Sequence, residues 1–406
     1  MSHNCRFCNS SNTHEIIDLG HQPPSNALLT KAQLDEPETT YPLRLYVCKD
    51  CWLVQIPESK KAVEIFDESY PYFSSDSPSN VSHAKEYVDM MMERFNPKTV
   101  LEIGSNDGYM LQWFQSKGCK VIGIDPAEKP ATVAHKRGIP TIKGFFRKGY
   151  VSQFDKLDLI CGINVLAHQP DINDFVAGLK IALAPAGVIT FEFPHVMEMV
   201  DKCQFDTIYH EHYCYFSLFT LCRIFNKHGL RIFDVDRIPE HGGSLRIYAQ
   251  HLPQGDVLLR RPDKVKDLIQ FEHDSGLFTV DYYAGFAADV AQVKHDLMSF
   301  LLGMDRDKTI VAYGAAAKGN TLLNYCGIRK DLIPMVVDIS KHKQGKYLPG
   351  SHIPIVAEED GIARYAPDYV LIMPWNLKAE IMEQLSYIRG WGGKFIIPIP
   401  RLEVLW

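Results

Sequence analysis

The sequence predicts an α/β fold in which a small cysteine module precedes two Rossmann-like units. Residues 99–125 read as an apolar strand, a glycine turn, a helix and a second strand ending on an acid, and residues 310–338 repeat this order. Two Cys-x-x-Cys pairs lie ahead of both units. The domains expected from these observations are a cysteine module at 1–70, a first unit at 71–254, a helical connector at 255–304 and a second unit at 305–406.

Composition and charge exclude several classes of protein. The chain is 46% hydrophobic and 23% charged, with a formal net charge of -6 and no basic run, so a nucleic-acid partner is not expected. The polar N-terminus lacks the apolar segment of a signal peptide, and no apolar run approaches the ~20 residues of a membrane helix. We therefore expect a cytoplasmic monomer without a membrane partner.

The N-terminal module carries the residues of a structural zinc site. Each Cys-x-x-Cys pair places two thiolates on one tight turn, and two pairs complete a tetrahedral set with no open position for chemistry. The metal replaces the core that so small a segment cannot build. A redox pair would need a thioredoxin-like unit around it, and a nucleic-acid ribbon is opposed by the negative charge. The expected ligands are Cys5, Cys8, Cys48 and Cys51.

An aromatic and hydroxyl-rich segment at residues 66–79 leads from the module into a helix expected over 81–95. Tyr70, Tyr72 and Ser74 either line a site or belong to a packed aromatic linker, and the local sequence leaves both interpretations open.

The first glycine turn favours S-adenosylmethionine over a dinucleotide. Its spacing is Gly-x-x-x-Gly, and Asp107 at the helix start would repel a pyrophosphate but tolerate a sulfonium with an amino-acid tail. The acidic Glu102 within the first strand also favours S-adenosylmethionine. Asp125 is placed to accept ribose hydroxyls. An ordinary turn capped by Asn106 or Asp107 is the alternative. The expected cofactor-binding residues are Tyr72, Ser74, Glu102, Gly104, Ser105, Asn106, Asp107, Asp125, Pro126 and Asn164.

Polar side chains follow two later strands of the first unit. Asn164 and His168 follow the strand expected at 157–161, at the entry to a helix expected over 165–183. Glu192 and His195 lie at the end of the next strand. These positions fall on the carboxyl edge of a parallel sheet, where doubly wound folds bind ligands.

Residues 206–217 hold an unusual density of histidine, tyrosine and carboxylate side chains. We interpret His212 as a catalytic base held by Glu211 and Tyr209, because a carboxylate beside a histidine fixes its tautomer and raises its basicity. A second metal site that uses His210 and His212 is one alternative, and a satisfied structural cluster is another.

Two further turns are candidates for anion binding. His241, Gly242 and Arg246 lie at the turn of a hairpin expected over 232–251, where a plain glycine turn is the alternative. In the second unit, Lys318 lies in a glycine turn that opens a helix, which suits a phosphate. The remaining substrate-binding residues expected in that unit are Asn320, Asp338, as a ribose ligand, and Lys341.

Taken together, these motifs resemble those of the sugar C-methyltransferases that methylate C3 of nucleotide-bound 4-keto-deoxysugars. The resemblance covers essentially the whole chain. Besides the cysteines, it rests on the motifs YPYFSS at 70–75, LEIGSNDG at 101–108, GIDP at 123–126, NVLAH at 164–168, YHEHYCYFS at 209–217, HGGSLR at 241–246 and AYGAAAKGN at 312–320.

The resemblance implies a methyltransferase core, a C-terminal domain that holds the nucleotide, and an acceptor similar to a TDP-linked 4-keto-6-deoxyhexose. It implies that His212 removes the C3 hydrogen to give an enolate and that Glu211 orients His212. It further implies that Tyr209 and His168 contact the enolate or the hydroxyls. Tyr70 is expected among the substrate-binding residues. Two alternatives stand beside it: an O- or N-methyltransferase acting on a nucleotide sugar, and a non-catalytic zinc-ribbon adaptor.

Overall fold

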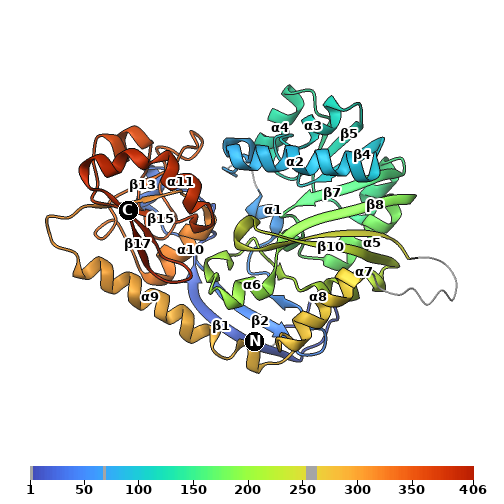
Figure 1. Cartoon of the computed structure of the whole chain (residues 1–406), viewed down its shortest axis with the longest axis horizontal. Coiled ribbons are helices and arrows are strands. Elements are labelled where there is room, and N and C mark those ends of the chain that lie inside the picture. Colours follow the sequence, from blue (N-terminus) through green and yellow to red (C-terminus); the bar gives the residue numbers. More distant parts are fainter. Residues whose placement is uncertain (1–2, 67–69, 253–262) are drawn as a thin grey trace.

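The computed structural model describes residues 3–66, 70–252 and 263–406, which form three β-sheets (Figure 1). The expected boundary at 254/255 and the first residues of the expected connector lie outside the described residues. No helix in the described part of the chain is both long and apolar enough to cross a membrane.

The N-terminal sheet is antiparallel and borrows a strand from far along the chain. Its order is β1-β2-β3-β9, with β9 pairing to β3 through Val54↔Tyr215 and Gln55↔Cys214. A short helix, α1 (Ala62–Ile65), follows β3. The strands are β1 (Thr13–Gln22), β2 (Tyr41–Cys48), β3 (Val54–Gln55) and β9 (Cys214–Tyr215).

The central sheet has the order β10-β11-β8-β7-β4-β5-β6, with β11 antiparallel to both of its neighbours. The remaining neighbours are parallel, so the carboxyl ends of β4, β5, β7 and β8 share one edge. The strands are β4 (Thr99–Ile103), β5 (Lys120–Asp125), β6 (Thr141–Lys143), β7 (Leu157–Ile163), β8 (Leu183–Pro194), β10 (Leu230–Ile238) and β11 (Ser244–His251).

Helices cover both faces of the central sheet because successive strand residues point to opposite sides. Val100 packs in the cluster formed with α2, α3 and α4, whereas Leu101 packs in the cluster formed with α5, α7 and α8. The helices are α2 (Pro78–Phe95), α3 (Leu111–Ser116), α4 (Glu128–Lys136), α5 (Ile172–Ala182), α6 (Val196–Asp201), α7 (Leu218–Lys227) and α8 (Asp263–Asp274).

The C-terminal sheet has the order β14-β13-β12-β15-β16-β17, parallel except for β17. It forms the orange and red lobe of Figure 1, and β1 passes beneath it beside α9. Its elements are β12 (Ile310–Tyr313), α10 (Ala317–Cys326), β13 (Val336–Val337), β14 (Ile355–Val356), β15 (Tyr369–Ile372), α11 (Lys378–Gln384), β16 (Lys394–Ile397) and β17 (Glu403–Leu405).

The described part of the expected helical connector contains two α-helices with different partners: α8 packs beside β10 of the central sheet, and α9 (Phe286–Gly303) packs beside α10. The helix expected over 165–183 is interrupted, because a 3₁₀ turn at Leu166–His168 precedes α5 and Asp171 caps the start of α5.

Candidate active site

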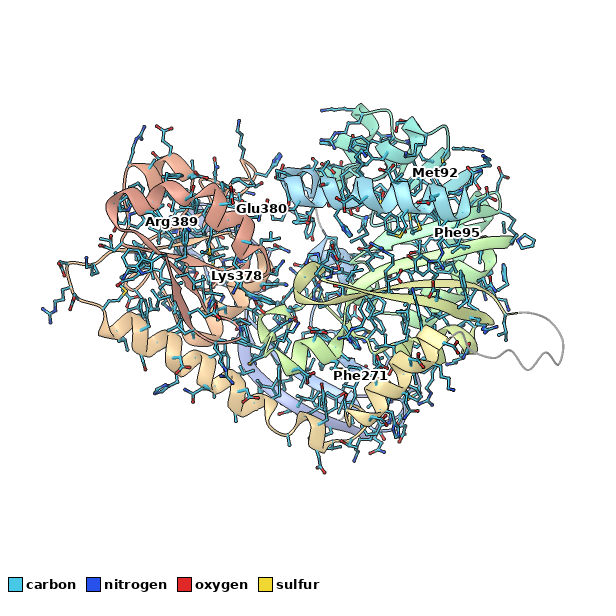
Figure 2. All side chains as sticks on the ribbon, in the orientation of Figure 1. Met92, Phe95, Phe271, Lys378, Glu380 and Arg389 are labelled. Carbon is cyan, nitrogen blue, oxygen red and sulfur yellow. The ribbon has the colours of Figure 1, made fainter. Side chains whose placement is uncertain are left out.

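A cavity of about 600 Å³ lies at the carboxyl edge of the central sheet, where loops of the C-terminal unit and the loop after β1 also line it. We call it the central cavity. Near the cavity, the start of α2 and the turn before it contact the C-terminal lobe. Ser79 donates a hydrogen bond at 2.6 Å to Glu380, which is labelled in Figure 2, and Ser340 donates one to Asp76 at 2.6 Å. The predicted residues that line it are Tyr70, Tyr72, Ser74, Gly104, Asn106, Asp125, Pro126, Asn164, His168, Tyr209, Glu211, His212, His241 and Lys318.

The glycine turn after β4 faces the central cavity and leaves little room for a side chain at Gly104. Gly104 has φ +69°, and a Cβ there would lie 3.2 Å from Cγ2 of Val165. Asn106 ties this turn to the aromatic segment, since its Oδ1 accepts from the Ser74 amide at 2.8 Å and its Nδ2 donates to the Tyr72 carbonyl at 3.2 Å. The aromatic segment therefore lines the cavity rather than serving as a packed linker.

Asp125 ends β5 at the cavity wall. Its two oxygens accept the backbone N–H groups of Asn106 and Ala127, each at 2.8 Å. Burial raises the pKa of Asp125 to about 6, against the backbone hydrogen bonds that lower it. Each carboxylate oxygen retains a further lone pair that can accept a ribose hydroxyl, so the residue fits the expected S-adenosylmethionine.

Three expected cofactor residues lie beneath the cavity wall and do not line it. Asp107 is buried against Arg137, at 3.2 Å, and against the Ser75 hydroxyl, so the expectation that its charge faces the ligand is wrong. Glu102 is fully buried, and burial, followed by the charges of Asp125 and Asp107, raises its pKa well above the usual range. Ser105 is also fully buried.

We expect Asp125→Ala to weaken S-adenosylmethionine binding by roughly 1.5–3 kcal/mol, the range for hydrogen bonds to a charged group. Titration calorimetry measures the effect. Asp158→Ala is the matched control, since Asp158 also accepts two backbone N–H groups, those of Lys98 and Thr99, but at the amino end of the sheet. Equal affinities in wild type and Asp125→Ala would remove Asp125 from the binding site.

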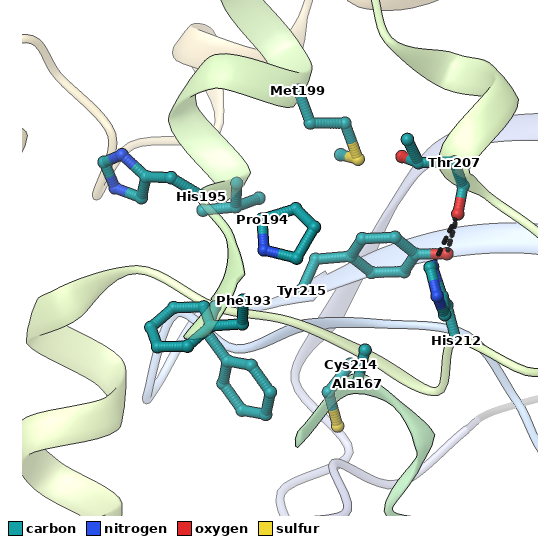
Figure 3. A pocket seen from close by; sticks show the side chains of 11 residues that line it. Ala167, Phe193, Pro194, His195, Met199, Thr207, His212, Cys214 and Tyr215 are labelled. Carbon is teal, nitrogen blue, oxygen red and sulfur yellow. Dashed lines mark hydrogen bonds between the residues drawn. The ribbon is translucent and has the colours of Figure 1, made fainter. Parts of the chain in front are cut away.

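His212 is held by two hydrogen bonds that define its tautomer. Its Nδ1 lies 2.9 Å from the Thr207 carbonyl and must donate, so Nε2 accepts from the Tyr209 hydroxyl at 2.6 Å. The Tyr215 hydroxyl donates to the same Thr207 carbonyl at 3.3 Å (Figure 3). Burial, and then the neighbouring His168, hold the pKa of His212 well below its usual range, so the ring is neutral at physiological pH.

Glu211 does not orient His212, and that expectation is wrong. Its carboxylate accepts from Nδ2 of Asn26 at 2.8 Å and from the Tyr70 hydroxyl at 3.4 Å. Burial raises the pKa of Glu211 to about 7, although both hydrogen bonds lower it. Adjacent residues in a turn can point in different directions, which sequence adjacency does not reveal. Asn26, from the loop after β1, is a cavity residue that the sequence reasoning missed.

The other two histidines of this region differ in position. His168 packs edge-on against His212 with ring centroids 4.8 Å apart, and burial lowers its pKa to about 4. His210 does not line the cavity, and its Nε2 donates to the Tyr41 carbonyl at 3.3 Å. Among the described residues, the four cysteines are the one group of three or more potential ligands that lie close enough to hold a metal ion. This gives no support to a second metal site at His210.

The hairpin turn contributes His241 but not Arg246. Nδ2 of Asn164 donates to Nε2 of His241 at 2.6 Å inside the cavity. Arg246 lies opposite Glu192 on the neighbouring strand and donates to it at 2.6 Å, so the expected anion site at Arg246 is wrong. A Cβ at Gly242 would lie 2.4 Å from the Trp375 ring, so this glycine serves packing.

Two histidines near this hairpin differ from the expectations drawn from the sequence. His195, expected at the site, is buried and paired at 2.8 Å with Glu272 of α8. His83 of α2, which the sequence reasoning missed, lines the cavity and contacts Glu192 at 2.6 Å and Glu240 at 3.1 Å.

In the C-terminal unit, Asp338 repeats the arrangement of Asp125. It accepts the backbone N–H groups of Ala315 and Ser340 and pairs with Lys343 at 3.2 Å. Lys343, rather than the exposed Lys341, lines the cavity. Neither Asp338 nor the fully buried Asn320 lines the cavity, so Asp338 orders the glycine turn and its expected ribose contact has no support here.

The four predicted cysteines form one cluster, with Cys5 and Cys8 ahead of β1 and Cys48 and Cys51 at the turn from β2 to β3. Their sulfur atoms all lie within 4.8 Å of one another, and two pairs are 3.4 and 3.6 Å apart. Thiolates at about 2.3 Å from a tetrahedral zinc lie about 3.8 Å apart, so the donor set and spacing fit this metal. The prediction of a Cys₄ zinc site is confirmed.

Comparisons with known proteins agree with this architecture. Family models match a zinc binding domain at residues 5–66, a methyltransferase domain at 82–235 and a C-methyltransferase C-terminal domain at 239–400. The chain is 35% identical to the C-methyltransferase NovU of Streptomyces niveus over 99% of this chain and 96% of that protein.

More distant similarities cover only part of the chain. A ubiquinone biosynthesis O-methyltransferase of Actinobacillus pleuropneumoniae is 28% identical over 26% of this chain and 50% of its own length. An S-adenosylmethionine-dependent methyltransferase structure from Mesorhizobium loti covers 42% of this chain and 100% of that chain, with 16% identity and a TM-score of 0.35.

Proposed function

The chain belongs to the C-methyltransferase family, and we propose that it methylates C3 of a dTDP-linked 4-keto-6-deoxyhexose through an enolate. S-adenosylmethionine supplies an electrophilic methyl group when it is bound at the glycine turn. The observation that supports the proposal most is the neutral, hydrogen-bonded His212–Tyr209 pair, which shares the central cavity with Gly104 and Asp125.

In this proposal His212 is the final acceptor of the C3 proton. Its Nδ1–H stays on the Thr207 carbonyl, which leaves Nε2 as the basic atom. The Tyr209 hydroxyl is hydrogen-bonded to Nε2. This hydroxyl must therefore either move away from Nε2, or pass its own proton to Nε2 as it takes the substrate proton. Either route ends with the proton on His212 and the electron pair in the sugar enolate.

The C-terminal unit is the proposed holder of the nucleotide. The glycine turn after β12 opens α10, and Ala316 and Ala317 at the start of that helix line the cavity together with Lys343. A helix start and a lysine together favour a diphosphate. The sugar would then reach from this turn toward His212, with Tyr70 and Glu211 placed to contact its hydroxyls.

We expect the protein to exchange the C3 hydrogen of the ketosugar nucleotide for deuterium in heavy water without S-adenosylmethionine. The 4-ketone acidifies the hydrogens on both neighbouring carbons, so NMR must locate the label. Label at C3 supports the proposal. Label at C5 would indicate that an enolate forms toward C5, and that C5 rather than C3 is the methylated carbon. An O- or N-methyltransferase, or an adaptor, would leave both positions unlabelled beyond the protein-free rate.

A further inference from the structure

Lys318 lies in the wall of the central cavity, and its amino group is buried. Its side chain lies over the Trp375 ring, with Nζ 5.0 Å from the ring centroid. Nζ is buried and has no hydrogen-bond partner in the part of the chain that the structure describes. A buried charge without a partner costs free energy, which indicates that an anionic ligand atom completes this position.

A second buried ionisable group, Asp206, contacts the same tryptophan. Its carboxylate accepts a 2.7 Å hydrogen bond from Nε1 of Trp375, and burial raises its pKa. Burial lowers the pKa of Lys318, and the charge of Asp206 opposes that shift. An anion in the cavity would favour the ammonium form further.

Two anionic groups of the proposed substrate are candidates, the diphosphate and the enolate oxygen. Burial is the main cause of the low pKa of His212 and of His241, and the charge of Lys318 lowers both further. Lys318 lines the same cavity as His212 and His241, so its amino group shares that cavity with the proposed base. Lys343, by contrast, is held at the glycine turn by Asp338 and by the Ala315 carbonyl at 2.9 Å.

We propose that Lys318 is a catalytic residue whose ammonium group stabilises the negative charge on the C4 oxygen of the sugar enolate. This inference rests on the proposed function. As the C3–H bond breaks, its proton goes to His212, and its electron pair forms the C3–C4 double bond. The former carbonyl oxygen then takes the charge next to Lys318. A preorganised cation at that point lowers the barrier of the proton transfer.

The test compares Lys318→Met with Lys343→Met in C3 deuterium exchange and in binding of thymidine diphosphate. Lys318→Met should slow exchange at saturating ketosugar nucleotide by about 10²–10³-fold, the range for losing one oxyanion donor. Its calorimetric affinity for thymidine diphosphate should equal that of wild type. Lys343→Met should show the converse pattern, with weaker diphosphate binding and a smaller effect on exchange at saturation.

Several outcomes would overturn the assignment. Weaker thymidine diphosphate binding in Lys318→Met, with wild-type exchange at saturation, would make Lys318 a phosphate ligand. Unchanged binding and unchanged exchange would make it a structural residue. A wild-type protein without any exchange would overturn the proposed function as well. Thermal unfolding of each variant shows that the comparison is made on folded protein.

Discussion

His212→Asn is expected to lower turnover by at least about 10²–10⁴-fold, the contribution of a positioned general base. Asparagine can keep a hydrogen bond to the Thr207 carbonyl but has no basic atom in place of Nε2. Both ligands should still bind, because Asp125 and the glycine turn of the C-terminal unit are untouched. Steady-state kinetics, calorimetry with each ligand and the C3 exchange assay measure these effects separately.

His210→Asn is the matched control for this variant. His210 lies two residues away, does not line the central cavity and bonds the Tyr41 carbonyl instead, so its turnover should stay near wild type. If His212→Asn exchanged C3 normally yet failed to methylate, His212 would act after deprotonation. His168 or Tyr209 would then be the better candidate for the base.

Cys48→Ser is expected to abolish folding of the N-terminal sheet rather than remove turnover alone. Structural zinc contributes about 10–16 kcal/mol in zinc-finger peptides, so losing one thiolate removes much of the stability of this module. Cys48 ends β2, and Cys51 leads into β3, the pairing partner of β9. Because β9 begins two residues after His212, loss of the metal should also displace the candidate base.

Zinc analysis, circular dichroism and thermal unfolding check this prediction. Wild type should contain about one zinc per chain. Cys119→Ser is the control, since Cys119 is similarly buried but lies outside the cluster and contacts the Pro97 carbonyl. Metal-free protein with full activity and an unchanged melting temperature would contradict the account.

The local patterns in the sequence predicted much of the fold. The apolar run around Val100, the glycine turn and Asp125 fix a βαβ unit, because strand, turn and helix are each encoded within a few residues. The pairing of β9 with β3 was not predictable in this way. A strand of two residues carries no periodic signal, and its partner lies far earlier in the chain.

The sequence predicted which types of residue form the candidate site better than it predicted which partners their side chains contact. The four cysteines form one cluster as expected, and Gly104 and His212 both line the central cavity as expected, because each motif carries its own geometry. The assignments of Asp107, Glu211 and Arg246 failed because their partners, Arg137, Asn26 and Glu192, come from distant segments. Side-chain direction in a turn and cross-strand pairing are set by tertiary structure.

The central claim is carbon methylation next to the ketone of a nucleotide-linked sugar. The most direct measurement incubates the protein with ¹³C-methyl S-adenosylmethionine and dTDP-4-keto-6-deoxyglucose and examines the product by NMR. The account predicts a ¹³C-methyl group bonded to C3, with a long-range correlation to the C4 carbonyl carbon. A methyl resonance at the shift of an O-methyl or N-methyl group, or no transfer at all, would contradict it.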